Sequence, residues 1–121
     1  MKNKPLQYLC SVYSSYPGGL EEAYLHVADL TGQLLLKGER IFSPIAHCHE
    51  AAQLNDLPTS FDWWMDYDEG FIDKCDSVLV AMMPLWRESK GITHEIAYAK
   101  TMLKTVRYLN VDTMEITNEP N

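Results

Sequence analysis

The segment from Ser89 to Glu95 combines residue types that bind anions and form covalent bonds. It is expected to open a helix, where the Ser89 hydroxyl and the unpaired N–H groups around Gly91 favour an anion. Glu95 follows on the second turn, near the same end of the helix. Ser89 is also explained as an ordinary helix cap, and Glu95 as a solvated carboxylate. Apolar Ile92 and Ile96 share the helical spacing of Glu95, so we expect it near the buried side.

A second candidate carboxylate is Asp68, on the helix expected over residues 61–74. The spacing places it on or near the apolar face of that helix. A carboxylate in such a position is costly unless it is paired or used in chemistry. Asp76, at the start of the following strand, is interpreted as a turn or capping residue.

Two histidines, His47 and His49, follow the second predicted strand. No nearby carboxylate or cysteine pattern completes a metal site with them, so both histidines are assigned to substrate contact or loop hydrogen bonding, and Ser43 and His47 are selected as contact residues. Trp86, in the loop before Ser89, is expected to stack on a planar ring or to join the core. The three cysteines have no metal or redox spacing and are interpreted as reduced thiols. The sequence therefore predicts no metal and no cofactor.

Strands and helices alternate along the chain. Predicted strands cover residues 6–12, 40–43, 76–83 and 105–109, and predicted helices cover 20–36, 61–74 and 89–103. Residues 44–60 are expected to be irregular, and 114–117 to add an edge strand. This order is typical of an α/β fold, an open parallel sheet of about four or five strands with helices on both faces, as in flavodoxin or Rossmann-like proteins. Ligands bind such sheets at the carboxyl ends of the strands, which directs attention to loops 10–19, 43–50 and 83–91.

Composition limits the classes of function. With 121 residues, 46% of them hydrophobic, the chain fits one domain over residues 1–121, with a core over 6–109 and an acidic tail over 110–121. The net charge of −7 disfavours a dedicated nucleic-acid binder. No apolar run approaches the ~20 residues of a membrane span. No signal-type segment is recognised, so cytoplasmic residence is expected. Dinucleotide-binding, P-loop and nucleophile-elbow motifs are missing from the sequence.

Four segments in a fixed order together resemble a known superfamily. They are Tyr8-Leu-Cys-Ser-Val-Tyr-Ser14, Phe42-Ser-Pro-Ile-Ala-His47, Tyr67-Asp68 with Phe71 and Cys75-Asp76, and Ser89-x-Gly91-x-x-x-Glu95. The set is similar to the nucleoside 2-deoxyribosyltransferase-like superfamily over about residues 6–109. Within it, the chain looks most like a small family of phages and bacteria that carries Phe-Ser-Pro-Ile-Ala-His.

The resemblance implies cleavage or transfer of an N-glycosidic bond. By position, Glu95 matches the glutamate that attacks the anomeric carbon, and Asp68 the aspartate that assists departure of the base. The loop that holds sugar and base in the superfamily matches Tyr8, Ser11 and Tyr13. In the nucleotide hydrolase branch, the serine matching Ser89 binds the 5′-phosphate. An oxocarbenium-like centre needs such a carboxylate and a proton donor near the leaving group.

The chain departs from the superfamily pattern in two places. The base-reading aspartate of the transferases is absent, unless Glu88 replaces it. The arginine and glycine with which the hydrolases hold phosphate after the first strand are replaced by Tyr-Ser-Ser-Tyr-Pro-Gly-Gly. The first hypothesis is therefore an N-glycosidase acting on a (deoxy)nucleoside 5′-monophosphate. Base exchange between nucleosides, a non-catalytic nucleotide-binding module and a partner-binding protein without ligand remain alternatives. A homodimer or larger homo-oligomer is expected from the resemblance.

Overall fold

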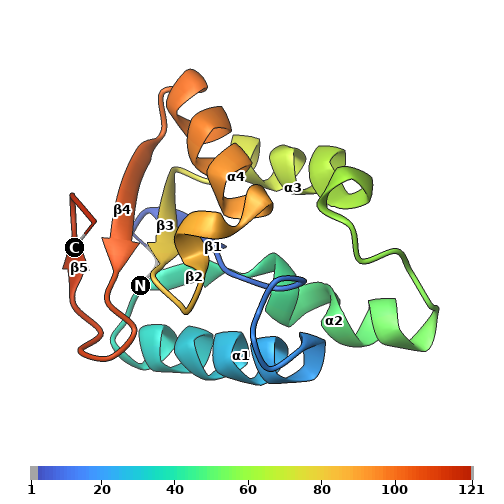
Figure 1. Cartoon of the computed structure of the whole chain (residues 1–121). Helices are drawn as coiled ribbons and strands as arrows, with labels where there is room; N and C mark the ends of the chain where they lie inside the picture. The colour runs from blue at the N-terminus through green and yellow to red at the C-terminus, as the bar shows by residue number, and fades with distance from the viewer. Residues whose placement is uncertain (1–2, 121) are drawn as a thin grey trace.

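A five-stranded sheet forms the centre of the molecule in the computed structural model, which describes residues 3–120 (Figure 1). The strand order is β2-β1-β3-β4-β5, in which β1 to β4 are parallel and β5 is antiparallel to β4. The elements are β1 (Leu6–Cys10), α1 (Leu20–Leu36), β2 (Arg40–Phe42), α2 (Pro44–Leu54), α3 (Phe61–Lys74), β3 (Ser77–Ala81), a 3-10 turn η1 (Trp86–Glu88), α4 (Lys90–Thr101), β4 (Thr105–Leu109) and β5 (Ile116–Thr117). The predicted open α/β fold is confirmed, and it is Rossmann-like.

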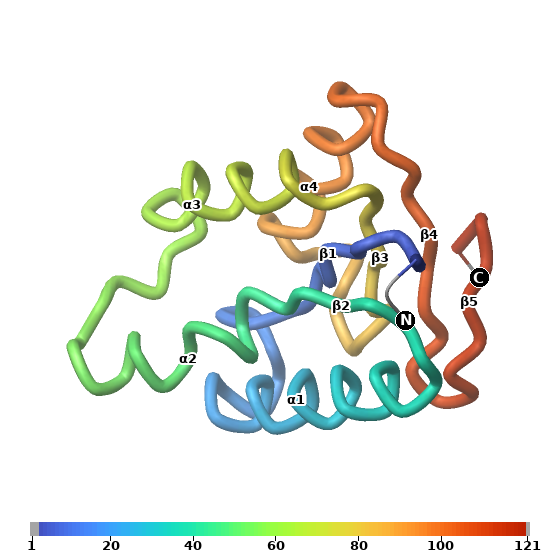
Figure 2. The backbone as a smooth tube through the Cα atoms, turned by 180° about the vertical axis from the view of Figure 1, so that it is seen from behind, coloured from blue at the N-terminus to red at the C-terminus, as the bar shows by residue number. Residues whose placement is uncertain are grey.

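The middle strand β3 carries the core. All five of its residues are buried, as expected for a parallel strand that is covered on both faces. The helices form two outer layers in both views: α1 lies on one side of the sheet with α2 beside it, and α3 and α4 lie on the other (Figures 1 and 2). Because β1 to β4 run in one direction, their carboxyl ends share one edge of the sheet.

Helix α2 corrects the prediction that residues 44–60 are irregular. Ser43 occupies the N-cap position, and its Oγ accepts a hydrogen bond of 3.1 Å from the backbone N–H of Ala46. Pro44 stands at the first helical position, where its missing N–H costs nothing. Only three residues of α2 are buried, so the apolar periodicity that marks a helix is weak here.

The other boundaries agree closely with the prediction. Ser60 stands at the N-cap position of α3, as expected, although its side chain makes no capping bond. Helix α4 ends at Thr101, before Leu103 turns into the left-handed region with φ 60°. The edge strand expected over residues 114–117 is present as Ile116–Thr117.

None of the helices within residues 3–120 combines the length and the apolar character needed to cross a membrane.

Candidate active site

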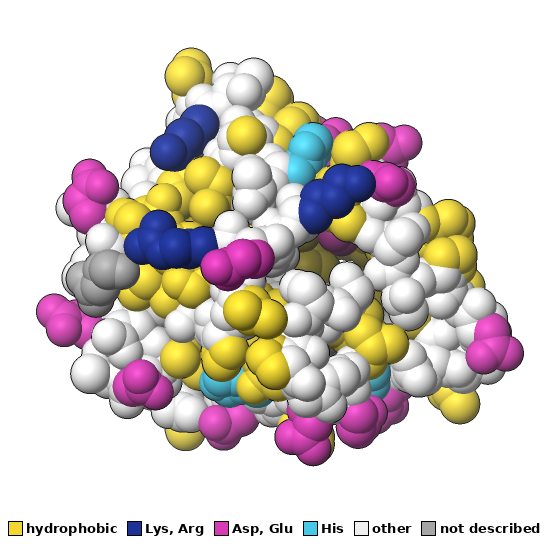
Figure 3. Space-filling view, viewed as in Figure 1, with side chains coloured by type: hydrophobic (Ala, Val, Ile, Leu, Met, Phe, Trp, Pro, Cys, Tyr) yellow, Lys and Arg dark blue, Asp and Glu magenta, His cyan; other side chains and the backbone are white. Residues whose placement is uncertain are grey.

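A cavity of about 360 Å³ opens at the carboxyl edge of the sheet, within the size range of small-molecule sites. Its walls come from the loop after β1, from α2, from the start of α3 and from the N-terminus of α4. In the space-filling view it is the hollow right of the centre (Figure 3). Of the predicted site residues, those that line it are Ser11, Tyr13, Asp68, Ser89, Gly91 and Glu95.

Glu95 lies on the inner face of α4 and is only 7% exposed, which confirms the expected buried side. The Tyr8 hydroxyl donates to its Oε2 at 2.5 Å from beneath the cavity. The Cys10 thiol is a second hydrogen-bond donor to the same carboxyl group. Burial raises the pKa of Glu95 to about 8, while the bonds from Tyr8 and Cys10 act in the opposite direction. Both donors favour the ionised form, so the protein stabilises a charge that its own burial penalises.

Asp68 faces the same cavity from α3. Burial raises its pKa to about 7, and a side-chain hydrogen bond with Tyr8 lowers it in part. The charge of Asp68 raises the pKa of Glu95 in turn. Two carboxyl groups that oppose each other's ionisation titrate as a pair, and near neutral pH the pair retains about one proton. One proton donor and one carboxylate are thereby held in one pocket.

The N-terminus of α4 forms another wall. The Ser89 Oγ accepts from the backbone N–H of Ile92 at 3.2 Å, so Ser89 is a helix cap as well as a cavity residue. That bond uses a lone pair and leaves the hydroxyl proton free to donate. A side chain on Gly91 would meet the Phe61 ring at 3.4 Å, so glycine keeps this wall open. The Lys90 ammonium pairs with Asp62 at 3.4 Å across the rim.

Besides Tyr8, which lies beneath Glu95, three more predicted contact residues lie outside this cavity. Ser43 uses its hydroxyl to cap α2. Trp86 lies in η1, where it packs on Tyr108 and against the Arg87 guanidinium, 4.4 Å from its ring centroid. His47 is exposed and lies against Phe42. The placement gives these three residues no contact with a ligand in the cavity.

His49, and not the selected His47, is the histidine of this segment that turns inward. Residues two apart on a helix point to nearly opposite sides, so helix α2 turns His47 outward and His49 inward. His49 is 3% exposed and lines the cavity. Its Nδ1 lies 2.7 Å from the Tyr13 hydroxyl, and its Nε2 lies 2.9 Å from Glu21. Recognising Ser43-Pro44 as a helix start would have shown this difference.

One protein family accounts for most of the chain. The sequence model described as "Domain of unknown function (DUF1937)" matches residues 8–111. The chain belongs to this family. The matched segment runs from Tyr8 beyond Glu95, so in this DUF1937 member it contains the carboxyl pair and every wall of the cavity. A comparison with curated proteins finds no match.

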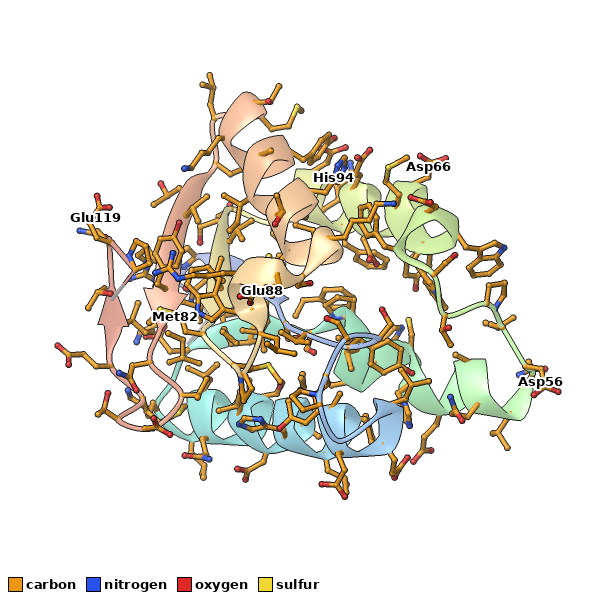
Figure 4. All side chains as sticks on the ribbon, viewed as in Figure 1. Asp56, Asp66, Met82, Glu88, His94 and Glu119 are labelled. Atoms are coloured by element: carbon orange, nitrogen blue, oxygen red, sulfur yellow. The ribbon has the colours of Figure 1, made fainter. Side chains whose placement is uncertain are left out.

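His94 and Glu88 are two further polar residues near the cavity. His94, one residue before Glu95, bonds Glu69 of α3 at 2.6 Å and packs against Phe61 (Figure 4). Glu88 lies beside the start of α4 and reaches the cavity rim (Figure 4). Within residues 3–120, no three His, Cys, Asp or Glu side chains are grouped so that they could hold a metal ion.

Proposed function

We propose that this protein is an N-glycosidase that cleaves the bond between base and sugar in a (deoxy)nucleoside 5′-monophosphate. The observation that carries the proposal is the buried carboxyl of Glu95, held by the Tyr8 hydroxyl at 2.5 Å on the floor of a cavity that Asp68 also lines. A buried carboxyl with a raised pKa beside a second carboxyl in a cleft is a common arrangement in acid–base and nucleophilic catalysis.

In the proposed mechanism, Glu95 forms the first new bond. A carboxylate oxygen of Glu95 attacks the anomeric carbon while the bond from that carbon to the base nitrogen breaks. The base takes the electron pair and a proton from Asp68, which leaves a glycosyl ester on Glu95 and an ionised Asp68. Asp68 then removes a proton from water as the water oxygen attacks the same carbon and the bond from that carbon to the Glu95 oxygen breaks. The products are free base and sugar phosphate, and both carboxyl groups return to their starting states.

The pKa values of about 7 for Asp68 and about 8 for Glu95 limit the active fraction of the protein. The reaction needs Glu95 ionised and Asp68 protonated, which is the minority arrangement for these two values. At a pH of about 7.5, roughly one molecule in twenty is in that state. The Tyr8 bond increases this fraction because it favours the ionised form of Glu95. The positive charge that develops on the sugar in the transition state is stabilised by the ionised Glu95.

The other end of the substrate is assigned to the N-terminus of α4. Ser89 keeps a hydroxyl proton free for a phosphate oxygen, and the first N–H groups of α4 have no partner within the helix. The Lys90 ammonium lies on the same rim and can exchange Asp62 for a phosphate. These groups provide local positive potential in a chain of net charge −7.

The test is release of free base, followed by chromatography. Purified protein is incubated with ribo- and deoxynucleosides and with their 5′-monophosphates. We expect base from the monophosphates and none after Glu95→Ala, whereas Glu22→Ala, which removes an exposed carboxylate on α1, remains active. Base that appears only when a second base is added identifies exchange instead of hydrolysis. Release that persists in Glu95→Ala, or no release from any compound, refutes the proposal.

A further inference from the structure

A second chain of polar side chains enters the cavity from the side opposite α4. It runs from Glu21 on α1, through His49 on α2, to the hydroxyl of Tyr13 in the loop after β1. The two distances are 2.9 Å and 2.7 Å. The ring of Tyr24 stacks on the imidazole with centroids 4.2 Å apart and planes 11° from parallel. Packing and two hydrogen bonds therefore fix the orientation of His49, although the mechanism above makes no use of it.

The order of these groups determines where the protons lie. The Glu21 carboxylate can only accept, so the Nε2 of His49 carries a hydrogen. In the neutral imidazole, Nδ1 is then an acceptor and takes the proton of the Tyr13 hydroxyl. The Tyr13 oxygen is left with lone pairs and no hydrogen to offer the cavity. A doubly protonated imidazole would reverse the last bond and turn Tyr13 into a donor.

The Tyr13 oxygen has a further polar neighbour. The side chain of Gln53 on α2 is a second hydrogen-bond partner of Tyr13, and it lowers the pKa of the phenol as a donor does. Burial and the charge of Glu21 raise that pKa, so Tyr13 keeps its single proton. Glu21, Glu50 and Gln53 border His49 on the side away from the main cavity. With His49 neutral, its Nδ1 at 2.7 Å takes the Tyr13 proton, and a ligand meets the oxygen as an acceptor.

The location of Tyr13 indicates which part of a ligand it meets. This step rests on the proposed function, in which Glu95 reaches the sugar and the N-terminus of α4 holds the phosphate. The base of the substrate then lies against the remaining wall, which is formed by α2, α3 and the loop after β1. Ile45, Ala52 and Trp64 contribute apolar surface to that wall of the cavity. Apolar side chains hold a flat ring, and a single placed polar atom selects its edge.

We propose that Tyr13, held as a hydrogen-bond acceptor by His49 and Glu21, selects bases with an exocyclic amino group, as in adenine and cytosine, over their keto counterparts. An amino group donates to the Tyr13 oxygen. A keto oxygen in the same place is an acceptor that faces the Tyr13 oxygen, which is also an acceptor, so no hydrogen bond forms between them. A site that accepts a hydrogen bond from an amino group therefore binds the keto base much more weakly. Glu21 and His49 act through Tyr13 and are positioning residues.

The experiment compares nucleotides that differ only in this group. Dissociation constants are measured by calorimetry for dAMP against dIMP and for dCMP against dUMP, with the Glu95→Gln variant so that the ligands stay intact. We expect the amino member of at least one pair to bind about tenfold more tightly. Tyr13→Phe should bring that ratio close to one.

Two substitutions of glutamate by glutamine on α1 test whether Glu21 positions Tyr13 through His49. Glu21→Gln presents either an acceptor or a donor to His49, so the tautomer is no longer fixed and the preference should fall at least threefold. Glu22→Gln makes the same change on the neighbouring exposed residue and should leave the preference intact. The side chain of Glu21 is 70% exposed, so its replacement leaves the fold in place.

The outcomes separate this proposal from the proposed function. Base release by the unmodified protein together with equal binding of both members, or tighter binding of the keto members, overturns the role of Tyr13 alone. A preference that survives Tyr13→Phe, or that changes equally in the Glu21 and Glu22 variants, also overturns it. No binding of any of the four nucleotides and no base release overturns both proposals.

Discussion

Replacing Glu95 by glutamine should make the stability of the protein much less dependent on pH. Burial raises the pKa of Glu95 from 4.5 to about 8, so between these values the folded state holds a proton that the unfolded state has lost. This contribution to stability is complete below the unfolded pKa and disappears as the pH rises through the folded pKa. At ~1.36 kcal/mol for each pKa unit, the unmodified protein should lose on the order of 4 kcal/mol from this group between pH 5 and pH 9.

Glutamine has the shape of the protonated acid and carries no charge to bury. Its carbonyl oxygen can still accept from Tyr8, so Glu95→Gln should match the unmodified protein at pH 5. At pH 9 the variant should be the more stable, with a melting temperature roughly 10 °C higher for a chain of this size.

The assay is thermal unfolding followed by circular dichroism across this pH range. The quantity compared is the difference in melting temperature between variant and unmodified protein at each pH, because groups that are not coupled to Glu95 titrate equally in both. Glu22→Gln, on an exposed position, should show a small and constant difference. A difference for Glu95→Gln that stays constant from pH 5 to pH 9 would show that the buried carboxyl is ionised throughout, and would refute the reasoning.

Four further predictions concern the site and are measured as kcat and KM for base release, with urea unfolding added for the last. Tyr8→Phe removes the donor at 2.5 Å from Glu95, so kcat should fall roughly 10- to 100-fold, and the rise of activity with pH should move to higher pH. The unmodified protein should show a bell-shaped profile centred at about pH 7.5, rising as Glu95 ionises and falling as Asp68 loses its proton. Asp68→Asn should lower kcat by roughly 10²-fold or more and abolish the fall at high pH, because asparagine has no proton to lose. Ser89→Ala should lower the free energy of unfolding in urea by about 1 kcal/mol, because the helix cap is lost. It should also raise KM for monophosphates about tenfold and leave KM for nucleosides unaffected. An equal change in KM for both kinds of substrate would contradict the phosphate role of Ser89.

The sheet could be predicted from the sequence because its signals are local and strong. The run Asp76–Met83 is apolar nearly throughout, and it contains the fully buried central strand. Helix α1 shows its buried stripe at helical spacing, and the loop lengths allow only a parallel arrangement of the first four strands. Helix α2 was missed because it buries little apolar surface and its start depends on two residues, Ser43 and Pro44.

The candidate site was predicted in part, and the limits have physical reasons. Asp68, Ser89 and Glu95 stand on elements whose positions follow from the fold, so their approach to one cavity could be expected. The role of His49 depends on the direction in which a helix turns each side chain, and that information was lost when residues 44–60 were interpreted as irregular. Tyr8 was predicted to touch the ligand, but it lies beneath Glu95 because side chains alternate between the faces of a strand.

The most direct test of the central claim is to trap the sugar on Glu95. The protein is mixed with a deoxynucleoside 5′-monophosphate, quenched in acid during turnover, digested with pepsin at low pH and analysed by tandem mass spectrometry. The account predicts the mass of a deoxyribosyl phosphate on Glu95, absent from Glu95→Gln treated in the same way. Base release accompanied by an adduct on Asp68, or by the same adduct in Glu95→Gln, would contradict it.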